Sequence, residues 1–105
     1  MPPETVFWRR MERDDILKEV IKASREVDRV ALIYGELYEF LGERQDKQSR
    51  AAMTSIGDRL TKAQEELDIL FSRLSDAHRA VMLARAEMQA DERLSNHRQA
   101  DGHCK

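Results

Sequence analysis

Two histidines and the single cysteine near the C-terminus are the side chains best suited to bind a metal ion. His103 and Cys104 are adjacent, and His97 lies six residues before His103. Zinc motifs pair ligands that are separated by about two to five residues and bring four of them together. These three residues do not follow that pattern. We therefore expect a solvated tail here, with no bound metal ion and no other cofactor.

Paired acidic residues and a lone histidine are the candidates for acid–base catalysis. Asp14 and Asp15 are neighbours, as are Glu65 and Glu66, but neighbouring side chains on a helix point in different directions. His78 is most simply a surface histidine. The sequence contains no glycine-rich phosphate loop and no nucleophile motif. We therefore expect no catalytic residues and no enzymatic activity.

One arginine keeps an enzymatic alternative open. Helix bundles can build sites in their interior from side chains on facing helices. Arg13 falls at a core position of the helical pattern described below. A small all-helical enzyme made by this chain would have its bundle-interior site at Arg13.

Charge limits the classes of partner. The formal net charge is −2, so the overall field does not attract nucleic acid. A nucleic-acid-associated regulator is still an alternative, because basic residues gather near the N-terminus and near the central turn, although acidic neighbours dilute them: Arg9, Arg10, Arg13, Arg44, Lys47 and Arg50. No apolar run is long enough to span a bilayer, and the first residues lack a secretory signal. A lone cysteine fits a reducing compartment, so we expect a cytoplasmic protein.

Two apolar ladders predict the elements that carry these residues. Charged residues make up 36% of the chain, with only 4 Gly and 2 Pro, which favours helices over a sheet. Steps that alternate between four and three residues keep one stripe of a helix facing a partner helix. The first ladder is Ile16, Val20, Ala23, Val27, Val30, Tyr34, Leu37 and Leu41. The second is Met53, Ile56, Leu60, Ala63, Leu67, Leu70, Leu74, Ala77, Val81, Ala84 and Met88.

A polar segment separates the ladders and predicts a turn. Gly42 follows the last apolar residue, where a helix often closes in a left-handed conformation. We predict one all-α domain over residues 1–95, a coiled-coil-like antiparallel hairpin, with a disordered tail at 96–105. Helix 1 covers about 4–41, although Asp14 or Asp15 is an alternative start, the turn covers 42–48, and helix 2 covers about 49–95. In the predicted register Tyr34 faces Ile56 and Val30 faces Leu60, with a shift of one heptad as the alternative.

Apolar residues also flank the ladders, and one hairpin cannot bury them all. In helix 1 they are Leu17, Ala31 and Tyr38 on one side, Ile33 and Phe40 on the other, and Ile21 and Leu32 further round. In helix 2 they are Ile69, Phe71, Met82 and Leu83. An extended exposed apolar strip is usually an interface. We predict a homodimer that forms a four-helix bundle; a complex with a different partner chain and a self-contained monomer are the alternatives. The predicted interface is Leu17, Ile33, Tyr38, Phe40, Ile69 and Phe71.

The N-terminal end has its own apolar cluster. We interpret Val6, Phe7, Trp8 and Met11 as a cluster out of phase with the ladder, whose next two positions towards the N-terminus are occupied by Arg13 and Arg9. Phe7 and Trp8 either cover the open end of the hairpin or belong to a second docking site. Trp and Arg often dominate binding energy, and Met suits adaptable surfaces. The candidate site is Phe7, Trp8, Arg9, Arg13, Met82, Leu83 and Met88.

The combined prediction is a non-catalytic protein–protein interaction module. It would act through an exposed apolar helical face, as a small adaptor, regulator, assembly chaperone or complex subunit.

Overall fold

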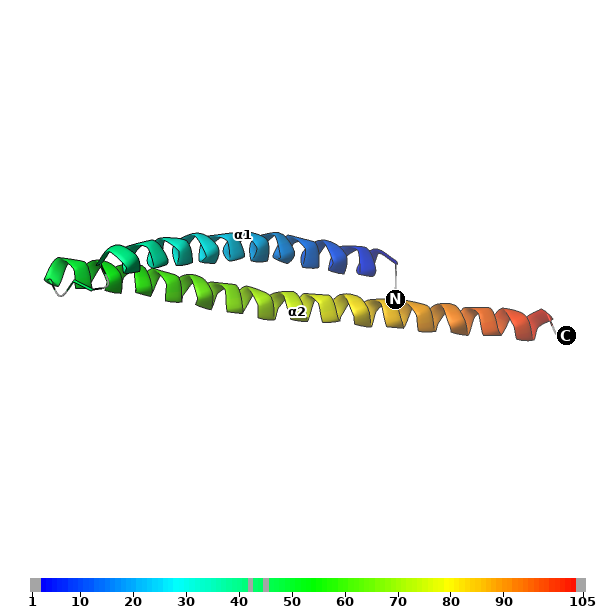
Figure 1. The fold of residues 1–105 in the computed structure, drawn as a ribbon. Coiled ribbons are helices and arrows are strands. Elements are labelled where there is room, and N and C mark those ends of the chain that lie inside the picture. Colours follow the sequence, from blue (N-terminus) through cyan, green and yellow to red (C-terminus); the bar gives the residue numbers. More distant parts are fainter. Residues whose placement is uncertain (1–2, 42, 45, 104–105) are drawn as a thin grey trace. The chain divides into compact units, whose positions relative to one another are not determined.

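The protein is all-α and consists of two long helices. The computed structural model describes residues 3–41, 43–44 and 46–103, with side chains for 4–41, 43–44 and 46–96. Helix α1 is Pro3–Leu41 and helix α2 is Lys47–His103 (Figure 1). No strand occurs in these ranges. The predicted helical hairpin is therefore confirmed.

Helix α1 takes the longer of its two predicted forms. It begins at Pro3, where proline is tolerated because the first-turn N–H groups have no partner in the helix. Glu4 places a negative charge in the first turn, which favours the N-terminal end of the helix dipole. The helix then continues through Asp14 and Asp15 without a break. It ends at Leu41, and the backbone N–H of Arg44 donates to the carbonyl of Leu41 at 3.0 Å.

Helix α2 begins at Lys47, slightly earlier than predicted, because Asp46 caps it. The Asp46 carboxylate accepts a bond from the backbone N–H of Ser49 at 3.0 Å and another from its hydroxyl at 2.8 Å. The backbone N–H of Arg50 donates to the carbonyl of Asp46 at 3.1 Å, the first bond of the helix. An aspartate in this place satisfies N–H groups that no earlier turn can reach. Gly42, the predicted left-handed residue, lies outside the described residues.

Helix α2 also ends later than predicted, at His103 instead of near residue 95. Residues 91–101 contain no proline or glycine, so nothing in their backbone chemistry stops the helix. The predicted end was placed where apolar residues stop recurring, but that pattern reports packing and not helicity. The disorder predicted for 96–105 stays a prediction. Cys104 and the side chains of His97 and His103 lie outside the described residues.

The chain divides into two compact units, each containing a part of both helices. The turn unit is Leu17–Ser72, and the terminal unit is Met1–Ile16 with Arg73–Lys105. In the turn unit the ladder residues form the core: Val20, Val30, Ile56 and Ala63 are buried. The ring of Tyr34 lies 3.6 Å from the point that a Cβ on Gly57 would occupy. That contact agrees with the predicted register, in which Tyr34 faces the neighbouring Ile56.

The terminal unit has a second small core, and it corrects the interpretation of Val6. Val6, Ile16, Val81 and Ala84 are buried. Val6 precedes Arg9 by three residues and Arg13 by seven, so it continues the ladder in phase, and only the two arginines interrupt it. Its neighbours Phe7 and Trp8 are exposed at 57% and 63%.

Candidate protein-interaction surfaces

Residues of the turn unit sort onto two sides of its helix pair. In an antiparallel pair of helices, equivalent heptad positions of the two helices lie on the same side of the pair. The structure shows this in two grooves. Tyr34, Tyr38 and Leu41 of α1 share one groove with Arg50, Met53 and Thr54 of α2. Glu19, Glu26 and Arg29 share the other with Glu66 and Leu70, and this second groove extends round α1 as far as Ile21.

The side that carries Tyr38 has few charges, and we call it the low-charge face. Its residues are of two kinds. The first kind comes directly after every second ladder residue, as Leu17 comes after Ile16, and the second kind lies four positions further along, as Ile21 does. In α1 these are Leu17, Ile21, Ser24, Asp28, Ala31, Gly35 and Tyr38; in α2 they are Arg50, Thr54, Gly57, Thr61, Gln64, Asp68 and Phe71. All are exposed except Ser24 and Gly57, which are half-buried. Three of these residues are charged, whereas the other outward positions of α1 in this unit are mostly Lys, Arg and Glu.

Two glycines lie on the low-charge face within regular helix. An added methyl group at Gly35 would meet nothing within 4 Å, and one at Gly57 would touch only the ring of Tyr34. Among the described residues no glycine has a positive φ, so the backbone does not require glycine at either place. Glycine in a helix interior costs about 0.5–1 kcal/mol relative to alanine. At Gly35 no close contact within the single chain requires glycine, so nothing in the fold of one chain offsets this cost.

The predicted interface residues are mostly exposed, but they do not form one patch. Leu17, Tyr38 and Phe71 belong to the low-charge face, with exposures between 41% and 61%. Ile33, which is half-buried, and Phe40, which is 77% exposed, flank the core on the opposite side of α1. Ile69 points outward from α2 and is also exposed. Tyr34 and Tyr38 stack at the turn end of the low-charge face, with ring centroids 6.4 Å apart.

Charge pairs occupy the side opposite the low-charge face. Glu26 binds Arg29 one turn later on α1 and, at 3.4 Å, Arg59 on α2. The hydrogen bond from Arg29 is the main reason that the pKa of Glu26 lies below its ordinary value of 4.5, and Arg59 adds to the effect while burial opposes it. At the turn, the backbone N–H and the hydroxyl of Ser49 hold the pKa of Asp46 below its ordinary value of 3.8.

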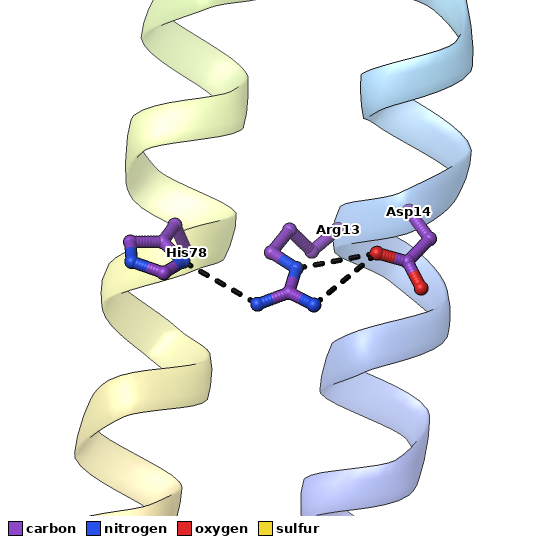
Figure 2. A network of polar contacts seen from close by, with 3 residues as sticks. All are labelled: Arg13, Asp14 and His78. Atoms are coloured by element: carbon purple, nitrogen blue, oxygen red, sulfur yellow. Dashed lines mark hydrogen bonds and ion pairs between the residues drawn. The ribbon is translucent and has the colours of Figure 1, made fainter.

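Arg13 is the centre of a polar cluster in the terminal unit (Figure 2). Its Nε and Nη2 each lie 3.3 Å from Oδ1 of Asp14, and its Nη1 lies 3.5 Å from Nδ1 of His78 on α2. A guanidinium only donates hydrogen bonds, so this contact is a hydrogen bond in the His78 tautomer whose Nδ1 is an acceptor. The Arg13 side chain is 26% exposed. This arrangement satisfies a charged residue at a core position without requiring a substrate.

The terminal unit also exposes apolar side chains near both chain ends. Phe7 and Trp8 meet edge to face, with ring centroids 5.5 Å apart. Met11, Met82, Leu83 and Leu94 are exposed, and Met88 is half-buried. Arg9 pairs with Glu12 at 3.6 Å. The predicted docking site thus exposes all its apolar residues except Met88, while Arg9 and Arg13 bind acidic neighbours of their own helix.

Sequence reasoning missed two parts of these surfaces. Leu94 lies alone in a polar segment, outside the ladder, and nothing in its spacing marked it. The low-charge face was overlooked because only apolar flanking residues were followed. Reading the same heptad positions for missing charge and for glycine would have found it.

The described residues hold neither a cluster of metal ligands nor a membrane-spanning helix. They contain no group of three or more His, Cys, Asp or Glu side chains placed to hold a metal ion. No described helical segment combines the length and apolarity needed to cross a membrane. No known protein family, curated protein or solved structure matches this chain.

Proposed function

We propose that this chain is a non-catalytic protein–protein interaction module of the cytoplasm. It acts as a small adaptor, regulator, assembly chaperone or complex subunit, and it binds a second copy of itself and a further protein. One observation carries the proposal: the turn unit exposes more large apolar side chains than it buries. Its exposed ones are Leu17, Ile21, Leu32, Tyr38, Phe40, Ile69 and Phe71, and its buried apolar residues are Val20, Val30, Ile56 and Ala63.

The energetic argument favours a covered state. Burying one large apolar side chain is worth about 1.5–3 kcal/mol. A small domain has a total stability of roughly 5–15 kcal/mol. The seven side chains are 41–77% exposed, so covering most of them supplies free energy comparable to that of folding. Because these residues lie on more than one side of the helix pair, a single partner chain does not cover them all.

The terminal unit supplies the surface for the further protein. Trp8 and Phe7 form a rigid aromatic pair, and aromatic anchors of this kind often dominate binding energy. Met82 offers an adaptable side chain nearby in the predicted register. Replacing both Trp8 and Met82 with alanine should abolish binding of this partner and leave the helix content unchanged. Unchanged binding would exclude this end as the docking site.

Two alternatives have less support. A nucleic-acid regulator would need a concentrated basic surface, but the net charge is −2, and of its candidate cations Arg9 and Arg13 each contact an acidic neighbour. An enzyme centred on Arg13 would need an open site at its guanidinium, and the groove that Arg9 lines with Glu12, Asp76 and Ala80 does not include Arg13.

Site-specific photo-crosslinking in the native cell tests the main proposal. A photoreactive phenylalanine analogue at position 40 should form adducts with protein, because Phe40 is 77% exposed and apolar. The same analogue at Glu65, an exposed charged position of α2, is the matched control and should form few adducts. Equal yields at the two positions, or no adduct from position 40, would contradict the proposal.

A further inference from the structure

Arg50 and Asp68 are the two charged residues of α2 on the low-charge face. Both are exposed. Neither side chain makes an ion pair or hydrogen bond within the part of the chain that the structure describes. They lie at opposite ends of the face, with Thr54, Gly57, Thr61 and Gln64 between them. An arrangement that reverses the direction of a second copy therefore brings unlike charges together.

We propose that the low-charge face binds a second copy of the chain in an antiparallel, two-fold symmetric arrangement. In this dimer α1 lies against the partner's α1, and α2 lies against the partner's α2. The proposal rests on the proposed function, because it names the first of the two partners and the face that holds it. It places Arg50 of each protomer opposite the partner's Asp68.

One symmetry axis satisfies both helices. An axis at residue 59 of α2 pairs Arg50 with the partner's Asp68, Thr54 with the partner's Gln64, and Gly57 with the partner's Thr61. An axis between residues 29 and 30 of α1 pairs Tyr38 with the partner's Ile21, Gly35 with the partner's Ser24, and Ala31 with the partner's Asp28. The hairpin register places Val30 nearly level with Leu60, which the contact between Tyr34 and Gly57 supports. The two axis positions therefore coincide to within about two residues.

The shape of the face suits this pairing. Its centre carries small residues, Ser24, Ala31, Gly35 and Gly57, and small residues let two helices approach closely. The ends carry Leu17 and Phe71 on one side of the axis and Tyr38 on the other. Because the partner runs in the opposite direction, its ends are exchanged. The partner's Leu17 and Phe71 come to the turn end of the first copy, toward the groove lined by Tyr34, Leu41 and Met53. Apolar residues then meet apolar residues at both ends.

The alternative two-fold arrangement pairs the charges poorly. If the two turns lay at the same end, α1 would pack against the partner's α2. Arg50 would then face the partner's Tyr38, and Asp68 would face the partner's Ile21. Neither of these two charges would gain an opposite charge. Asp28, the third charged residue of the face, gains none in either arrangement and does not distinguish them. Charge complementarity therefore selects the antiparallel dimer.

Charge reversal measured by sedimentation equilibrium tests the arrangement. Arg50→Asp and Asp68→Arg each create two like-charge contacts per dimer, so each should raise the dimer dissociation constant by about tenfold to a hundredfold. The double variant R50D/D68R restores both pairs and should return the constant to within about threefold of the original. Lys62→Asp and Glu65→Arg are matched controls, since they make the same changes in net charge outside the face and should have little effect. Circular dichroism verifies that every variant remains helical.

The outcomes separate this inference from the proposed function. Weaker dimerisation in both single variants, together with recovered dimerisation in the double variant, would support the antiparallel dimer. A wild-type chain that stays monomeric, or reversals no stronger than their controls, would overturn it. Adducts at position 40 in the crosslinking experiment would even then support a protein partner, so the interaction module would survive the loss of this dimer.

Discussion

Replacing Val30 with alanine should produce one of the largest losses of stability available in the turn unit. Val30 has no exposed surface. Valine to alanine removes two methyl-sized groups, worth about 0.8 kcal/mol each. The cavity left behind adds to that loss because neighbours relax only in part. The expected loss in the free energy of unfolding is therefore about 2–3 kcal/mol.

Thermal unfolding followed by circular dichroism measures this change. In a chain of this size each kcal/mol lowers Tm by roughly 4–8 °C, so Val30→Ala should lower it by roughly 8–24 °C. Both proteins must be compared at one concentration, since a dimer makes Tm depend on concentration. Leu32→Ala is the matched control, because Leu32 lies two residues away and is 64% exposed. It should change stability by less than about 0.5 kcal/mol. Equal losses at the two positions would refute the core described above.

Three further predictions concern the low-charge face and the two perturbed carboxylates. Gly35→Leu should leave the helix content unchanged or higher and should dissociate the dimer in sedimentation. Glu36→Leu, which lies outside the face, should leave the dimer intact. If both variants stayed dimeric, the result would contradict close approach of the helices at Gly35. Asp46→Ala removes the cap of α2 and should lower Tm and fray the start of that helix by hydrogen exchange, while Asp46→Asn should retain most of the stability; equal effects would argue against capping. The pKa values of Glu26 and Asp46 are lowered in the folded chain, so their stabilisation is present above their ordinary values of 4.5 and 3.8 and is lost as pH falls through the folded values. Tm should therefore drop on acidification below pH 4.5, and by less in Glu26→Gln; a variant with an unchanged acid profile would show that Glu26 contributes nothing.

The core was predictable from sequence because helix packing imposes a fixed period. Val20, Val30, Ile56 and Ala63 are ladder residues, and all four are buried. Helix ends were less predictable because they depend on local hydrogen bonds. The start of α2 is set by the carboxylate of Asp46, and its end at His103 lies beyond the last apolar residue.

The candidate surfaces were predictable only in part. Exposure of Phe40, Tyr38 and Ile69 follows from the count of apolar residues that one helix pair can bury. Their distribution over different sides depends on how each residue is rotated relative to the core, which a list of apolar residues does not contain. Val6 shows the same limitation: its position is in phase with the ladder, but two intervening arginines hid the pattern.

The register of the hairpin is the feature that repeating ladders leave most open, and polar contacts resolve it. A slip of one heptad would still place apolar residues opposite apolar residues. It would also move the helices by about 10 Å relative to each other, which would break the contact of Arg13 with His78 at 3.5 Å. In the turn unit the same slip would remove Gly57 from beneath the ring of Tyr34. Residues that depart from the apolar repeat therefore distinguish one register from the next, because a perfectly regular ladder carries no information about which heptad faces which.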